Sequence, residues 1–95
     1  MSKIVHEFSN PVPTPEGVLH TARVLGEQAD GHWHGSLEFT PHGGGPPLRT
    51  GRETSQTTYE QLEYWASGLS PDYLDMAFRR ATPVEQEKRR RRAAP

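Results

Sequence analysis

The chain has 95 residues and no cysteine, which indicates one small domain without disulfides, thiolate metal ligands or cysteine nucleophiles. Its net charge of −1 combines a basic run, Lys88–Arg92, with a remainder that holds six basic and twelve acidic residues. No apolar run has the length of a membrane span and no signal-peptide pattern opens the chain, so we expect a soluble cytoplasmic protein without membrane contact.

The first half of the chain predicts an antiparallel hairpin preceded by a short edge strand. Residues 3–8 fit a short edge strand, with Ile4, His6 and Phe8 on one side and Val5 and Glu7 on the other, and prolines make residues 10–16 an extended connector. Asp30-Gly31 is a preferred two-residue turn between two β-rich runs, so we place the hairpin turn there.

This turn sorts the side chains of the hairpin into two faces. One face places Arg23 opposite Glu38 and Glu27 opposite His34, and we expect this polar face to be exposed. We expect the helices to pack on the more apolar face, which holds Val18, His20, Ala22, Val24, Trp33, Gly35, Leu37 and Phe39.

Residues 48–57 predict a third strand that is polar on both faces. Arginine forks onto carboxylates or phosphates, and threonine and glutamine add neutral hydrogen bonds, so this strand is a candidate recognition surface. Two other interpretations stay open: an exposed edge strand whose charges prevent association, or arginines that pair with helix carboxylates such as Glu60 or Glu63. The candidate binding residues, including two helix tyrosines, are Arg49, Arg52, Glu53, Thr54, Gln56, Tyr64 and Tyr73.

Two amphipathic helices are predicted within residues 58–81. Thr58 and Gln61 fit a capping box that begins the first helix, and Ser70 followed by Pro71 fits the start of the second. Each helix is too short to be stable alone, so its apolar stripe must pack on the sheet. The two stripes contain Leu62, Trp65, Ala66 and Leu69, and then Leu74, Ala77, Phe78 and Ala81.

These elements predict an α+β fold: a small three- to four-stranded antiparallel sheet followed by two C-terminal helices packed on one face. We expect residues 1–82 to form a single domain and residues 83–95 to form a basic, flexible tail. That tail is either solvated, folded back onto the acidic body, or a binding element.

No catalytic or cofactor signature is present, and we expect a small non-enzymatic module that binds another protein. A homodimer is also open, because an exposed third strand could pair with its own copy. We expect no metal and no cofactor; a histidine metal site is a weaker alternative, with His32, His34 and His42 as its ligands. The main alternative is a nucleic-acid-associated protein that uses Arg79, Arg80, Lys88, Arg89, Arg90, Arg91 and Arg92.

Overall fold

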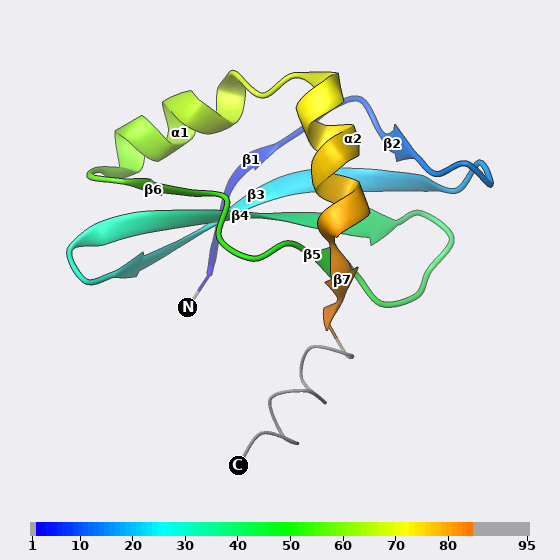
Figure 1. Ribbon diagram of the computed structural model, residues 1–95, viewed down its shortest axis with the longest axis horizontal. Helices are drawn as coiled ribbons and strands as arrows, with labels where there is room; N and C mark the ends of the chain where they lie inside the picture. Colours follow the sequence, from blue (N-terminus) through cyan, green and yellow to red (C-terminus); the bar gives the residue numbers. More distant parts are fainter. Residues whose placement is uncertain (1, 85–95) are drawn as a thin grey trace, which may run out of the picture.

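The computed structural model describes residues 2–84, which form two layers. One layer is an antiparallel sheet. Helices α1 (Tyr59–Ser67) and α2 (Pro71–Arg80) follow each other along one side of it (Figure 1). The expected α+β class, with an antiparallel sheet and two helices, is confirmed. Neither helix in this part of the chain is long and apolar enough to cross a membrane.

A long hairpin of β3 (Leu19–Ala29) and β4 (His32–Pro41) forms the centre of the sheet. Its two turn residues, Asp30 and Gly31, both have positive φ angles (54° and 75°), as a two-residue hairpin turn of this type requires. Ala29 pairs with His32, and the register continues without a shift along the hairpin. The predicted turn and register are therefore confirmed.

Short strands extend the hairpin on both sides. β1 (Lys3–Glu7) and β2 (Val12–Pro13) pair with β3, whereas β5 (Leu48–Arg49) and β6 (Thr54–Gln56) pair with β4. β7 (Thr82–Pro83) then pairs with β5 after the helices, so the main strand order is β1-β3-β4-β5-β7.

The predicted strand count is too small, because within residues 2–84 the sheet has seven strands. Each flank of the hairpin is interrupted: residues 8–11, which include Pro11, separate β1 from β2, and a bulge separates β5 from β6. The helices are also not the last elements, since β7 follows them, and it includes Pro83 at the expected start of the tail. The remainder of that tail lies outside the described residues.

Both predicted helix starts are confirmed. The Thr58 hydroxyl accepts a hydrogen bond from the Gln61 N–H (3.1 Å), and the Gln61 side chain accepts from the Thr58 N–H (3.3 Å). The Ser70 hydroxyl accepts from the Tyr73 N–H (3.1 Å), and Pro71 occupies the first turn of α2.

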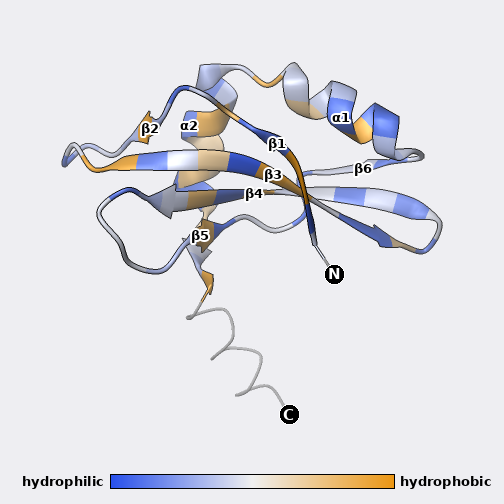
Figure 2. Ribbon diagram, turned by 180° about the vertical axis from the view of Figure 1, so that it is seen from behind, coloured by the Kyte–Doolittle hydropathy of each residue, from blue (hydrophilic) through white to orange (hydrophobic). Residues whose placement is uncertain are grey.

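The core lies between the helices and the predicted apolar face of the hairpin. Its largest fully buried side chains are Phe39, Leu37, Leu62 and Val24. Burying each of them contributes about 1.5–3 kcal/mol relative to exposure. Figure 2 shows the corresponding hydrophobic stretches on the sheet strands and along the helices. Val18, in contrast, precedes β3 and is exposed, so its placement on the buried face was wrong.

The opposite face of the hairpin is less exposed than expected. Leu25 is buried there, between its strand partners Ile4 on β1 and Ser36 on β4. His34 is half-buried, and its strand partner on the other side is Ser55 of β6. The expectation that this face is fully exposed was wrong. β1 and β6 pair with the outer edges of the hairpin, so Leu25 and His34 have strand neighbours on both sides.

Candidate functional site

The predicted polar strand is divided by a bulge between β5 and β6, and Arg52 in this bulge is exposed. The N–H groups of Thr50 and Glu53 donate to the carbonyl oxygens of Leu37 (3.0 Å) and Gly35 (2.8 Å) on β4. The buried Thr50 hydroxyl also accepts from the Leu37 N–H (3.0 Å). The backbone is thus anchored on both sides of Arg52, which is exposed.

Glu53 attaches this bulge to α2. Its side chain is only 9% exposed, and it forms an ion pair with Arg80. Its carboxylate also accepts a hydrogen bond from the Tyr73 hydroxyl (2.7 Å). A carboxylate this deeply buried needs such partners, because an unpaired buried charge is strongly destabilising. The Glu53 and Tyr73 side chains therefore have an internal role in the fold.

Burial and the contact with Glu53 keep the Tyr73 hydroxyl protonated well into the alkaline range. Burial, together with the hydrogen bond to Glu53 and its negative charge, raises the pKa of Tyr73 from 10.0 to about 12, and Arg80 lowers it in part. At neutral pH, Tyr73 is therefore a neutral hydroxyl that donates to the Glu53 carboxylate.

Arg49 takes part in a row of alternating charges across the face of the sheet away from the helices. The Glu7 carboxylate lies 2.7 Å from Arg23, and Arg23 lies 3.9 Å from Glu38. Glu38 in turn lies 2.9 Å from the Arg49 guanidinium. Arg49 is thus paired within the sheet and not with a helix carboxylate. The predicted pairing of Arg23 with Glu38 is confirmed.

Among the predicted binding residues, Arg52 and Tyr64 have side chains that are free to meet a partner, whereas Gln56 and Thr54 do not. The Gln56 amide donates to the Thr54 hydroxyl (2.7 Å), so these two residues contact each other. Within residues 2–84, Arg52 has no ion pair and no side-chain hydrogen bond. Tyr64 on α1 is 83% exposed, the most exposed of the large apolar and aromatic residues in this part of the chain.

A shallow depression lies beside Tyr64. Its lining combines an aromatic surface with amide, hydroxyl and carboxylate groups, so it offers both stacking and hydrogen bonding. It extends from β6 over the first turns of α1. Its residues are Gln56, Thr58, Glu60, Gln61, Tyr64 and Trp65.

The candidate metal ligands do not converge. No group of three or more histidine, aspartate or glutamate side chains within residues 2–84 has the geometry to hold a metal ion. His32 lies 3.0 Å from the Asp30 carbonyl oxygen, and the His42 ring lies 2.9 Å from the Thr21 hydroxyl. The His32 and His34 rings are 6.4 Å apart and stacked.

His34 and Ser55 form a hydroxyl–imidazole pair that the sequence did not indicate. The His34 Nδ1 atom lies 2.6 Å from the Ser55 hydroxyl, while its buried Nε2 atom has no partner among the described residues. Such a pair resembles a nucleophile with its base, but acyl transfer also needs oxyanion donors and a substrate cavity. Neither the depression beside Tyr64 nor the α2 cavity described below includes this pair.

Both candidate nucleic-acid residues on α2 have acidic partners. Arg80 pairs with Glu53, and Arg79 lies 3.4 Å from Asp75 one turn earlier on the helix. Each positive charge is therefore offset locally. The other members of that predicted set, Lys88–Arg92, lie outside the described residues.

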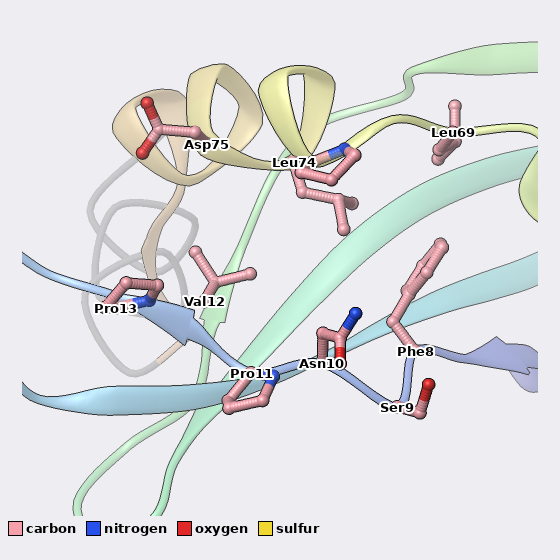
Figure 3. Close-up of a pocket in the computed structure, with 10 residues that line it drawn as sticks. Phe8, Ser9, Asn10, Pro11, Val12, Pro13, Leu69, Leu74 and Asp75 are labelled. Atoms are coloured by element: carbon pink, nitrogen blue, oxygen red, sulfur yellow. The ribbon is translucent and has the colours of Figure 1, made fainter.

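The sequence also gave no signal for a cavity of about 270 Å³ between the N-terminal connector and α2. Figure 3 shows Phe8, Val12 and Leu74 directed into this space, with Asn10 on the connector beside them. The volume lies just below the range of about 300–1,000 Å³ that is usual for small-molecule sites. It suits a single apolar side chain better than a cofactor.

Comparison with known protein families, with curated proteins and with solved structures found no match for this chain.

Proposed function

We propose that the chain is a small non-enzymatic interaction module that binds another protein through the surface around Tyr64. The observation that carries this proposal is the 83% exposure of the Tyr64 side chain beside a polar depression. Tyrosine is enriched where proteins recognise each other, because its ring is large and its hydroxyl forms hydrogen bonds. Without a partner, an exposed ring of this size gains little stability.

The bulge supplies a second contact of different chemistry. Arg52 is exposed, and nothing within residues 2–84 neutralises its charge. An arginine on an anchored backbone loses less freedom on binding than one on a mobile loop, which favours its use in recognition. In this proposal Tyr64 and Arg52 contact the partner, and Glu53 and Tyr73 hold the bulge in place.

The proposal includes a cytoplasmic location, which the lack of cysteine supports. The nucleic-acid alternative has less support, because Arg79 and Arg80 both pair with carboxylates of the domain. That alternative would depend mainly on Lys88–Arg92.

The test is capture of proteins from the host with matched variants of the full chain. Wild type, Tyr64→Ala and Arg52→Ala are immobilised beside Met76→Ala, which truncates an exposed side chain on the other helix. We expect a defined protein to be retained by wild type and Met76→Ala. It should be depleted about tenfold or more by Tyr64→Ala, because an interface hot spot is worth about 2 kcal/mol or more.

The purified partner is then titrated against the same four proteins, and thermal melts verify that every variant is folded. Equal retention and equal affinity for wild type and Tyr64→Ala would show that Tyr64 is not part of a protein-binding surface.

A further inference from the structure

The outer face of α1 carries an acidic surface around Tyr64. Glu60, Glu63, Tyr64 and Ser67 follow the i, i+3, i+4, i+7 spacing, so they lie on one face of the helix. All four are exposed, and they lie opposite the buried face that contains Leu62. We call these four residues the acidic face.

The carboxylates of the acidic face are not neutralised by the domain. Within residues 2–84, neither Glu60 nor Glu63 has a cationic partner. The basic residues of the same region are mostly occupied elsewhere: four arginines have carboxylate partners, and Lys3 lies over the Tyr59 ring (4.6 Å to its centroid). Six basic and ten acidic residues precede residue 85, so this region has a net charge of −4.

The complementary charge is present in the same chain. Lys88–Arg92 supplies five consecutive cations, which begin four residues after Val84. The eight residues from Glu85 to Arg92 extend over at most about 29 Å from Val84. Four of the five cations are arginines, which bind carboxylates through two parallel hydrogen bonds and also stack on aromatic rings. The acidic face offers both of these groups.

We propose that the acidic face of α1 binds the chain's own Lys88–Arg92 segment, and that this segment competes with the partner for Tyr64. The proposal rests on the proposed function, because both use the same surface. The Arg side chains pair with Glu60 and Glu63 and stack on Tyr64. A partner must then displace the segment. The apparent affinity of the partner is therefore its intrinsic affinity multiplied by the fraction of chains in which the surface is free.

The test uses the full chain with Lys88–Arg92 replaced by alanine, which removes the internal competitor. A fluorescent synthetic peptide of residues 86–95 is titrated into it at low salt. We expect saturable binding that weakens as salt is added, because exposed ion pairs are screened. Wild type should bind the same peptide more weakly than the alanine variant, since its own segment competes.

A matched pair of charge changes separates a specific face from general attraction. In the alanine background, Glu60→Gln with Glu63→Gln should weaken peptide binding about threefold or more, because each exposed pair contributes about 0.2–1 kcal/mol. Glu16→Gln with Glu27→Gln removes the same charge at exposed positions outside the acidic face and should leave the affinity unchanged.

Equal weakening by both pairs of changes, or the absence of saturable peptide binding, would overturn the proposal. The proposed function is judged separately by the capture experiment. If Tyr64→Ala still loses the host protein while the peptide fails to bind, only the competition by Lys88–Arg92 is refuted.

Discussion

Gly26 on β3 and Gly35 on β4 are strand partners, and together they form the surface on which Leu62 of α1 packs. A Cβ atom on Gly26 would lie 2.9 Å from a Leu62 methyl carbon, and one on Gly35 would lie 2.8 Å from the other. Real side chains do not approach so closely. Two glycines at one rung of the hairpin thus allow α1 to lie close to the sheet.

We therefore predict that Gly35→Ala destabilises the protein by about 1–3 kcal/mol, the usual cost of overpacking a filled core. The new methyl group would also lie 3.0 Å from a Thr54 methyl carbon, so Leu62 has little room to move. The control is Gly51→Ala on the bulge, where a Cβ atom meets nothing within 4 Å. Urea denaturation measures the free energy of unfolding of both variants. Equal values for Gly35→Ala and Gly51→Ala would contradict the close packing of α1 on the sheet.

The features that could be predicted from sequence are local. Asp30-Gly31 determined the turn, and the turn determined the register of the whole hairpin, because side chains alternate strictly along paired strands. Thr58 with Gln61, and Ser70 with Pro71, marked the helix starts through hydrogen bonds that span three or four residues.

The features that could not be predicted depend on contacts between distant residues. Nothing near Glu53 in the sequence indicates that it meets Tyr73 and Arg80, which follow 20 and 27 residues later. The bulge at Arg52 and the division of the flanking strands depend on how the chain fits β4. For the candidate site, the sequence indicated polar residues and tyrosines but not which of them the fold itself uses.

The Tyr73 contact predicts a loss of stability in alkaline solution. Folding raises the pKa of Tyr73 from 10.0 to about 12, so the folded chain holds this proton more tightly than the unfolded chain does. The resulting stabilisation is complete below pH 10 and is lost as the pH rises from 10 toward 12.

The variant Tyr73→Phe tests this contact because it keeps the ring and removes the hydroxyl. At pH 8 we expect it to be about 1.5–3 kcal/mol less stable than wild type, since the lost hydrogen bond is to a charged group. The difference should shrink when both proteins are denatured with urea above pH 10. A constant difference over this range would mean that the hydroxyl does not bind Glu53.

The core predicts a large cost for truncating Phe39. Its side chain is fully buried and lies edge-to-face with Phe78 of α2, with 5.2 Å between the ring centroids. Phe39→Ala should cost about 3–5 kcal/mol, a large part of the total stability of a small domain. Tyr64→Ala is the control and should change stability by less than about 0.5 kcal/mol, as exposed substitutions do. A Phe39→Ala variant within about 1 kcal/mol of wild type would place the core elsewhere.

The basic segment predicts only negligible binding to duplex DNA at physiological salt. With Arg79 and Arg80 paired to carboxylates, Lys88–Arg92 would have to act by phosphate neutralisation alone. Such binding is blind to sequence and falls with salt by a slope of about −0.9 per contacted phosphate, or about −4.5 for five contacts. The rest of the chain carries a net charge of −6, which opposes the approach of DNA.

A fluorescence titration at about 0.15 M salt, where the screening length is about 8 Å, measures the affinity of the chain for duplex DNA. Replacement of Lys88–Arg92 by alanine provides the matched control. Micromolar or tighter binding that this replacement abolishes would favour the nucleic-acid function over the protein-binding one.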